Sequence, residues 1–285
     1  MKKILITGAN SYVGTNVEKW LMKEPDKYYV ETLDMKDPNW KDFDFSKFDV
    51  VFHVAGFAHA KETRKNRDLY YKINRDLSND LAMVCKKNNI EHFIFMSSMS
   101  VYGIESGVID SESIPNPKSA YGKSKFEAEQ FILNLKDNDF RISIVRPPMI
   151  YGESCKGNYQ KLKKLAQRLP VFPNINNSRS MIYIDNFSEF IKIIIDKKMD
   201  GIFLPQNSEY VNTTQLAKAL AFLNNKDLIT TTIFNFIINI FMFGRVKKLF
   251  GSLIYDKKAS LLNLKYNIFS FEESIVNKKS ESAKL

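Results

Sequence analysis

The N-terminal stretch KKILITGANSYVG, residues 2–14, decides the fold. Residues 2–7 form a short apolar run that ends at Gly8, and the chain then continues with apolar side chains at helical spacing. The residues that share this predicted helical face are Val13, Val17, Trp20 and Leu21. A strand that enters a glycine turn and continues into a helix is the first half of a strand–helix–strand unit. We therefore expect parallel strands joined by crossover helices.

The same alternation continues through the first half of the chain. Further strands are predicted at 28–34, 48–56, 92–98 and 140–147, and helices at 67–87 and 119–135. The apolar positions of the first of these helices are Leu69, Ile73, Leu77, Leu81 and Val84. The run 48–56 is almost wholly apolar, as in a strand that is covered on both faces. The pattern predicts an α/β fold, a Rossmann-type doubly wound parallel sheet.

The rhythm changes after Gly152. A basic helix is predicted at 156–168, and short mixed elements follow it. We expect a nucleotide-binding sheet domain at 1–152 and a smaller C-terminal α/β part, mainly substrate-binding, at 153–285. The segment near 181–200 is expected to return to the sheet.

Composition excludes several classes of protein. The chain has 285 residues, 44% hydrophobic and 26% charged, which is ordinary for a globular protein. The most apolar window, IFNFIINIFMF at 233–243, is too short to cross a bilayer of ~30 Å. A buried or partner-facing helix is the preferred interpretation of this window, ahead of a helix on a membrane surface. The N-terminus has no signal-peptide core, and we expect no membrane span.

Cysteine, histidine and charge also bear on the kind of site. The chain has Cys85 and Cys155 but no CxxC motif, which favours a reducing cytoplasm without disulfides. His53, His59 and His92 lack metal-ligand spacing, so we expect no metal site. The net charge is +10, but the lysines are spread and no nucleic-acid motif is present, so no nucleic-acid partner is expected. A positive field would also attract an anionic small molecule such as a nucleotide diphosphate.

The glycine turn predicts a phosphate-binding loop. Gly8 permits the tight turn, and Gly14 lets the helix lie close to the strand. The helix then presents free N–H groups and a partial positive charge to a pyrophosphate. Ser11 takes the place of the usual middle glycine; its hydroxyl could donate to a phosphate, although its Cβ crowds the approach. The residues predicted to bind a dinucleotide here are Gly8, Asn10, Ser11, Tyr12, Val13 and Gly14.

Asp34 lies 26 residues after Gly8, at the end of the second predicted strand. A carboxylate at this place accepts hydrogen bonds from the adenosine ribose and repels a 2′-phosphate, which favours NAD over NADP. Lys36, two residues after Asp34, weakens the predicted preference for NAD over NADP. Asp34 also fits an ordinary turn, because LDMKDP is a good turn sequence.

The stretch SAYGKSK, residues 119–125, predicts a proton-transfer group. Tyr121 and Lys125 are four residues apart on a predicted helix, so their side chains share one face. A free tyrosine has a pKa near ~10, and a neighbouring ammonium is expected to lower it. Ser97, Ser98 and Ser100 follow the preceding strand and could orient a substrate hydroxyl. The alternative for the same residues is a solvent-facing helical turn.

Five motifs in order, TGANSYVG, HVAGFAH, SSMSVYG, YGKSK and RPPMIYG, resemble the extended short-chain dehydrogenase/reductase superfamily, in its nucleotide-sugar epimerase/dehydratase group. The resemblance covers roughly residues 2–275. It implies a Rossmann domain that holds NAD and a smaller part that binds a nucleotide diphosphate sugar, with a UDP-sugar expected first. It further implies an enzyme, a setting in polysaccharide synthesis and a possible homodimer; the cysteine usage and the N-terminus predict that this enzyme is cytoplasmic.

The resemblance also implies roles for single residues. Ser98, Tyr121 and Lys125 correspond to the catalytic triad of the family, with Ser98 also touching substrate. Asn74 matches an asparagine that supports the catalytic lysine. The cofactor contacts implied beyond the glycine loop are Asp34, Ala55, Gly56, Asn74, Tyr121 and Lys125.

The resemblance further implies that three residues in the C-terminal half bind substrate: Asn158, Arg179 and Arg245. Arginine suits a diphosphate because its planar fork forms bidentate hydrogen bonds with phosphate oxygens. Arg245 fits a cation at the end of a helix equally well. Val171 and Phe172 could line a base pocket or simply pack.

Two positions at which the chain differs from the dehydratases of this family limit the reactions that we expect. Nucleotide-sugar 4,6-dehydratases carry an Asp–Glu pair where this chain has Met99 and Ser100, so dehydration is disfavoured. In a 4-epimerase, Tyr121 takes the proton of the sugar 4-hydroxyl while a hydride moves from carbon 4 to NAD and returns to the other face. The alternative is reduction of a 4-keto nucleotide sugar by NADH or NADPH. Epimerisation is preferred because Asp34 suits NAD and SSMSVYG resembles epimerases; a non-catalytic dinucleotide sensor is a third alternative.

Overall fold

The computed structural model describes residues 1–58, 60–233, 235, 250–260 and 264–275. The chain divides into two compact units: the first is 1–103, 114–148 and 187–205, and the second is 104–113, 149–186 and 206–285. Arg245 lies outside the described residues. So does the predicted helix at 233–243, apart from Ile233 and Asn235.

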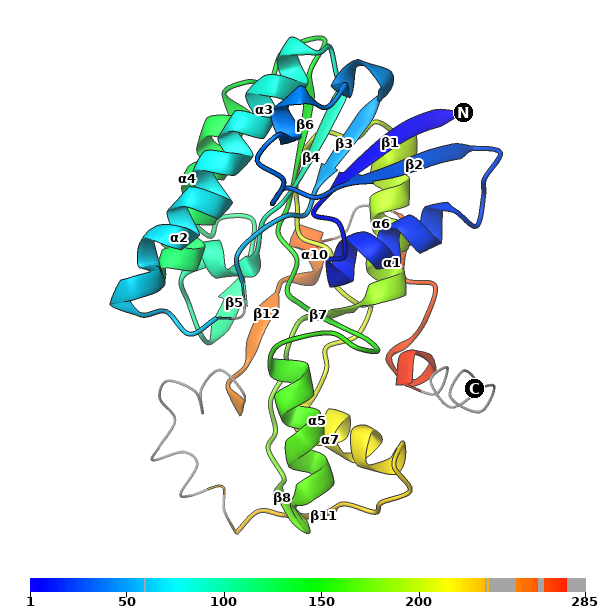
Figure 1. The fold of residues 1–285 in the computed structure, drawn as a ribbon. Coiled ribbons are helices and arrows are strands. Elements are labelled where there is room, and N and C mark those ends of the chain that lie inside the picture. Colours follow the sequence, from blue (N-terminus) through cyan, green and yellow to red (C-terminus); the bar gives the residue numbers. More distant parts are fainter. Residues whose placement is uncertain (59, 234, 236–249, 261–263, 276–285) are drawn as a thin grey trace. The chain divides into compact units, whose positions relative to one another are not determined.

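The first unit contains the predicted parallel sheet (Figure 1). Six strands follow the spatial order β10–β6–β4–β3–β1–β2, and every neighbouring pair is parallel. Their bounds are β1 Lys2–Thr7, β2 Tyr28–Leu33, β3 Val50–His53, β4 His92–Met96, β6 Arg141–Val145 and β10 Gly201–Phe203. Ile4 of β1 pairs with Val30 on one side and Val50 on the other, so the first strand lies inside the sheet. The predicted α/β, Rossmann-type parallel sheet is confirmed.

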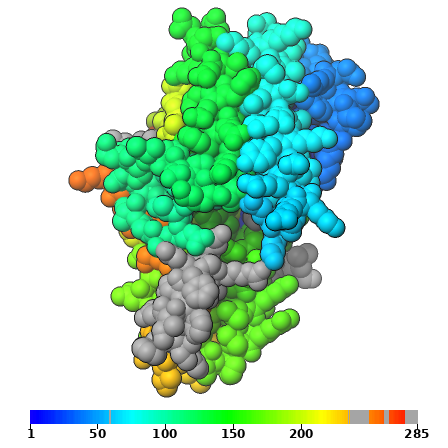
Figure 2. All heavy atoms as spheres, turned by 90° about the vertical axis from the view of Figure 1, so that its left-hand side faces the viewer, coloured from blue at the N-terminus to red at the C-terminus, as the bar shows by residue number. Residues whose placement is uncertain are grey.

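Helices cover both faces of this sheet (Figure 1). They are α1 Tyr12–Leu21, α2 Arg67–Tyr71, η4 Lys72–Asp76, α3 Leu77–Lys87, α4 Ala120–Leu133 and α6 Ile184–Asp196, the last of which begins in the second unit. The helix predicted at 67–87 is continuous, but its middle turn, η4, is a π-helix. Leu69 is 39% exposed, which differs from its expected place among the packing residues. On the face in Figure 2, α2 and α3 lie beside α4.

Short helical turns complete the first unit: η1 Trp40–Asp42, η2 Phe45–Lys47, η3 Arg64–Asn66 and η5 Met99–Tyr102. The core on one side of the sheet joins strand residues such as Val51 and Phe93 to Leu81 of α3 and Ile132 of α4. These side chains are fully buried, and apolar burial of this kind supplies most of the stability of a domain. The strand ends that carry the polar motifs are held in place by this core.

The second unit is built from three two-stranded parallel pairs and short helices. β5 Gly107–Ile109 pairs with β12 Leu253–Tyr255, β7 Met149–Tyr151 with β9 Met181–Tyr183, and β8 Val171–Pro173 with β11 Ile229–Thr231. Among the described residues of this unit, its helices include α5 Asn158–Arg168, α7 Thr213–Phe222 and α10 Lys257–Ser260. α5 confirms the basic helix predicted at 156–168. No helix in the described parts of the chain is long and apolar enough to cross a membrane.

Candidate active site

The glycine turn after β1 is closed by backbone contacts that only glycine allows. Gly8 has φ +103°, and a Cβ there would lie 2.8 Å from the amide nitrogen of Ala55 and 2.9 Å from its Cα. The amides of Gly8 and Ala9 both donate to the carbonyl of Leu33, at 2.9 and 3.2 Å. The turn is therefore fixed to the ends of β2 and β3.

The start of α1 lies close to β1, as the sequence predicts. A Cβ on Gly14 would lie 3.3 Å from Cγ2 of Ile6 and 2.7 Å from Oγ of Ser11. The Ser11 side chain caps the helix by accepting a hydrogen bond from the amide of Gly14 at 3.1 Å. Asn10 reaches the left-handed region with φ +62°. The serine in the place of the middle glycine thus begins the helix.

Asp34 is exposed and directly follows Leu33, whose carbonyl holds the glycine turn. Its carboxylate accepts a hydrogen bond from the amide of Lys36 at 3.0 Å, which forms an Asx turn. One oxygen makes this bond, and a carboxylate has further lone pairs that can accept from a ribose. Both predicted roles of Asp34, turn residue and ribose acceptor, fit this position.

Tyr121 is in the first turn of α4, and Ser98 lies near it. Ser119 caps this helix by accepting from the amide of Gly122 at 3.1 Å. A Cβ on Gly122 would lie 2.6 Å from the carbonyl oxygen of Ser100, so the helix lies directly against the serine loop. The Ser98 hydroxyl is close enough to Tyr121 to act as a hydrogen-bonding group that lowers its pKa, and its Oγ donates to Oγ of Ser100 at 3.1 Å. The structure therefore brings the predicted serine and tyrosine into contact.

Lys125 lies one helical turn further on and is only 3% exposed. Its Nζ donates to the carbonyl of Met96 at 2.8 Å and lies 4.6 Å from the ring centre of Phe95. The backbone at the end of β4 therefore fixes the position of the ammonium group.

Asn74 supports this arrangement from the π-helical turn. Its Oδ1 accepts from the amide of Phe57 at 2.7 Å, and its Nδ2 donates to the carbonyl of Phe57 at 3.1 Å and to Oγ of Ser124 at 3.2 Å. A Cβ on Gly56 would lie 3.1 Å from Oδ1 of Asn74 and 3.3 Å from Nζ of Lys125. The backbone at Gly56 therefore lies close to Asn74 and Lys125, both of which the sequence predicts as site residues.

Burial shifts the pKa values of Lys125 and Tyr121, the two proton-transfer groups, in opposite directions. It lowers the pKa of Lys125 to about 7, although the Glu129 carboxylate acts to raise it. Burial raises the pKa of Tyr121, although its hydrogen bond with Ser98 acts to lower it. The expected net lowering of the tyrosine pKa is wrong in this structure, because the cost of burying a phenolate outweighs the favourable contact.

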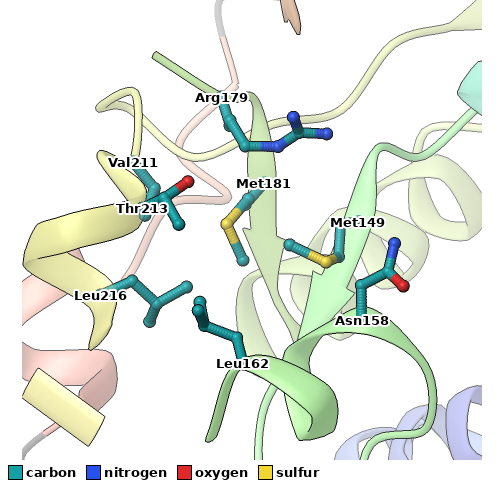
Figure 3. A pocket seen from close by; sticks show the side chains of 8 residues that line it. All are labelled: Met149, Asn158, Leu162, Arg179, Met181, Val211, Thr213 and Leu216. Carbon is teal, nitrogen blue, oxygen red and sulfur yellow. The ribbon is translucent and has the colours of Figure 1, made fainter. Parts of the chain in front are cut away.

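The predicted substrate residues Asn158 and Arg179 line one pocket of the second unit (Figure 3). Met149 and Met181 come from the neighbouring strands β7 and β9, and Leu162 from α5. Three further residues complete the lining: Val211, Thr213 and Leu216. The pocket thus joins an apolar floor to a guanidinium and an amide.

Backbone and side-chain hydrogen bonds fix the position of Arg179, and its guanidinium has further N–H donors. Its backbone pairs with Val211, and its Nη1 donates to the carbonyl of Gly251 at 2.7 Å. Burial lowers its pKa. Within the described residues, no carboxylate pairs with this guanidinium, which is the condition in which an anion is bound best. Phe172, by contrast, is fully buried, and its ring centre lies 5.9 Å from that of Phe250. This favours packing over the lining of a base pocket as its role.

Three buried polar residues near the proton-transfer pair were missed by the sequence analysis. Ser124 accepts from Asn74 and donates to the carbonyl of Tyr121 at 3.0 Å. Glu129 and Arg146 form a buried ion pair behind Lys125. A signal for Glu129 was present, because it lies four residues after Lys125 on the same helix face.

These features define the extended short-chain dehydrogenase/reductase class: a parallel sheet, a glycine turn at the start of α1, and a tyrosine and lysine on one helix beside a serine. The chain belongs to the NAD dependent epimerase/dehydratase family, whose model matches residues 4–203. In the described part of the chain no three His, Cys, Asp or Glu side chains gather in a metal-binding cluster.

Relatives and solved structures agree with this assignment. The chain is 30% identical over 247 residues to a UDP-glucose 4-epimerase of Vibrio cholerae, covering 77% of this chain and 75% of the relative. It is 31% identical over 206 residues to N-acetyl-alpha-D-glucosaminyl-diphospho-ditrans,octacis-undecaprenol 4-epimerase of Escherichia coli O157:H7, covering 66% of this chain and 62% of that relative. In fold it is similar to UDP-glucuronic acid 4-epimerase of Bacillus cereus, with a TM-score of 0.76, 20% identity and 99% of both chains covered.

NAD, the cofactor of this family, fits the residues of the first unit. Because Gly8 has no Cβ, the tight turn can pack directly against the backbone of Ala55, as the phosphate-binding turn of such a fold requires. α1 begins at the same turn and offers its N-terminal amides. Asp34 follows the strand that holds the turn and leaves acceptor capacity for the ribose.

Proposed function

We propose that this protein is an NAD-dependent 4-epimerase of a sugar carried on a diphosphate. The observation that carries the proposal is the contact between Ser98 and Tyr121 on the helix face that also holds Lys125. This arrangement suits removal of a proton from a sugar hydroxyl, and it occurs in a chain of the epimerase/dehydratase family.

Tyr121 acts as the acid/base. In the first half-reaction it takes the proton of the sugar 4-hydroxyl, and in the second it returns a proton to the 4-keto oxygen. Ser98 hydrogen-bonds with the tyrosine and orients the sugar hydroxyl beside it. NAD, when bound, supplies the acceptor and later the donor of the hydride at carbon 4. The keto sugar must present its other face before the hydride returns.

Lys125 and Tyr121 titrate as a pair. Because the pKa of Lys125 is near 7 and that of Tyr121 is raised, the pair loses its first proton near neutral pH. That singly protonated pair includes the form with a charged lysine and a phenolate, which is the form able to accept a proton. The hydrogen bond from Nζ to the carbonyl of Met96 fixes the lysine, which lies one helical turn after the tyrosine.

Arg179 and Asn158 are proposed to bind the diphosphate carrier, with a UDP-sugar as the first candidate. The spare donors of Arg179 match the bidentate geometry of phosphate oxygens. A polyprenyl diphosphate, the carrier named for one of the 4-epimerase relatives, presents the same two phosphates. Arg245 and the homodimer expected from the resemblance stay predictions.

Water elimination is not part of the proposal. Met99 and Ser100 stand after Ser98 in η5, and neither provides the carboxyl groups that a 4,6-dehydration requires.

The test is incubation of the purified protein with UDP-glucose, UDP-galactose and their 2-acetamido counterparts, without added cofactor, followed by chromatography. We expect a new 4-epimer peak that Tyr121→Phe abolishes while the protein still retains NAD. Unchanged sugars, together with consumption of NADH or NADPH on a 4-keto nucleotide sugar, would identify a reductase instead. An unaltered output of Tyr121→Phe would favour a sensor.

A further inference from the structure

A stripe of three cations runs along α5. Lys161, Lys164 and Arg168 follow the spacing i, i+3, i+7, so they share one helix face, and all three are exposed. The opposite face is buried through Tyr159, Leu162 and Ala166. Within the described residues, none of the three cations pairs with a carboxylate. The stripe therefore presents net positive charge to its surroundings.

Large apolar side chains lie exposed next to the end of this stripe. Ile229 is 66% exposed and Ile233 is 78% exposed. β8 follows α5 directly and pairs with β11, placing Val171 opposite Ile229. These two isoleucines have apolar area in contact with water that burial would stabilise.

Hydrogen bonds fix the cationic and apolar parts to each other. Nζ of Lys226 donates to the carbonyls of Ala166, Gln167 and Leu169, at 3.2, 2.8 and 2.6 Å. The loop between α7 and β11 is thereby attached to the C-terminal end of α5. We call the three cations of the stripe together with Ile229 and Ile233 the α5–β11 surface.

The neighbouring helix extends the same pattern. Lys218 and Phe222 are four residues apart on α7, and both are exposed. In the segments 154–173 and 211–233 the only acidic residue is Asp227. The surface therefore combines several cations with apolar groups and little opposing charge.

We propose that the α5–β11 surface binds the anionic surface of a lipid bilayer. Lysine and arginine near such a surface are attracted by its negative potential, and adjacent apolar side chains enter the headgroup boundary. A nucleic acid would account for the cations but not for exposed isoleucines beside them. The protein is held on the membrane face, since no described helix can cross it.

The pocket of the second unit shares α5 with this surface. Leu162 lines the pocket, while Lys161 and Lys164 point outward on the other side of the helix. A lipid-carried diphosphate sugar would meet the protein at the membrane face where this helix binds. This consequence rests on the proposed function, whereas membrane binding itself does not.

The test is co-sedimentation of the full chain with vesicles, without any nucleotide sugar. Phosphatidylcholine vesicles are compared with vesicles in which phosphatidylglycerol replaces part of the phosphatidylcholine, at low and high salt. Lys161→Gln with Lys164→Gln removes two charges from the stripe, and Ile229→Ser with Ile233→Ser removes apolar area. The matched control, Lys19→Gln with Lys87→Gln, removes two exposed charges from helices of the first unit.

We expect binding to the phosphatidylglycerol vesicles that weakens at high salt. Each lysine at an anionic surface contributes about fivefold, so the stripe variant should bind about twentyfold or more weakly. The isoleucine variant should also bind less, and the control should bind like the wild type. All variants are checked for an unchanged thermal transition.

Three results would overturn the proposal. The wild type could fail to sediment with anionic vesicles at low salt, or the control variant could lose as much binding as the stripe variant. Binding of RNA without binding of vesicles would assign the cations to a different partner. Because no substrate is present, a negative result here leaves the epimerase proposal untouched.

Discussion

Glu129 of α4 forms a bidentate, buried ion pair with Arg146, the residue that follows β6. Nη2 of Arg146 lies 2.6 Å from Oε2 of Glu129, and Nε lies 3.1 Å from Oε1. Nη1 of the same guanidinium donates to the hydroxyl of Tyr102 in η5 at 2.9 Å. One pair thus connects the helix of Tyr121 to the end of β6 and to the turn that begins after Ser98.

Replacing Glu129 by glutamine should shift the pH dependence of the reaction. Glu129 lies one turn after Lys125, and its negative charge raises the lysine pKa, which burial has lowered to about 7. Without that charge the pKa of Lys125 falls further, so the pair loses its first proton at lower pH. We expect the acidic limb of kcat/KM against pH to move to lower pH in Glu129→Gln.

Few other groups near Lys125 could move the acidic limb in this way. His53 on β3 is buried, and its pKa is well below its ordinary value because of burial and the nearby Lys125, so it stays neutral. The matched control is Glu127→Gln, which removes a carboxylate from the same helix, α4, and breaks its partly exposed pair with Arg75 of η4. Urea unfolding separates stability from titration, since an unpaired buried Arg146 costs about 3–5 kcal/mol. A less stable variant with an unmoved limb would show that Glu129 is purely structural.

Replacing Lys125 by methionine should move the acidic limb in the opposite direction. The first ionisation of the pair is then lost, and Tyr121 must ionise alone with its raised pKa. A limb displaced from near 7 to above 10 lowers the rate at pH 7 by about a thousandfold. Single-turnover rates measured from pH 6 to the limit of protein stability check this, with NAD content measured alongside. A limb that stayed near 7 would mean that another group sets it.

Replacing Gly8 by alanine should abolish NAD retention and destabilise the first unit. The new Cβ would lie 2.8 Å from the amide nitrogen of Ala55, and φ is +103°. The control is Gly107→Ala, where φ is +120° but no described atom beyond the chain neighbours lies within 4 Å of the new Cβ. The control carries the backbone strain alone, about 1–2 kcal/mol. NAD content after purification and urea midpoints report the two effects, and equal losses in both variants would contradict the role of close contact at Gly8.

The sequence was sufficient for features whose causes are local. The order of strands and helices follows from apolar spacing, and the Tyr121–Lys125 face follows from a separation of four residues. The π-helical turn at η4 could not be predicted from local sequence. It coincides with the hydrogen bond between Asn74 and Phe57, which are 17 residues apart in the chain. β10 is only three residues long and too short for a periodic signal. The sign of the Tyr121 pKa shift depends on burial, which spacing does not report.

Replacing Arg179 by glutamine should weaken substrate binding more than it slows the chemistry. Its guanidinium donates to the carbonyl of Gly251, and a guanidinium has further donors for a diphosphate. A hydrogen bond to a charged group contributes about 1.5–3 kcal/mol, so KM should rise about tenfold or more while kcat changes little. Initial rates against UDP-sugar concentration measure both constants. A fall in kcat with unchanged KM would place Arg179 in the chemical step and contradict the proposed diphosphate contact.

Replacing His92 by glutamine should make the protein less sensitive to acid. His92 begins β4, is 1% exposed and hydrogen-bonds through Nε2 with Oγ of Ser143 at 2.7 Å. Burial lowers its pKa from 6.5 to about 4, so between these values the unfolded chain binds a proton that the folded chain does not. The free energy of unfolding therefore falls as the pH drops below 6.5, by at most about 1.4 kcal/mol per pH unit for this residue. The glutamine amide can keep the bond to Ser143 without titrating, and the carboxylates contribute equally to both proteins. Urea unfolding at pH 8 and pH 5 gives the comparison, and an equal loss of stability in wild type and variant would show that His92 is already protonated in the folded protein.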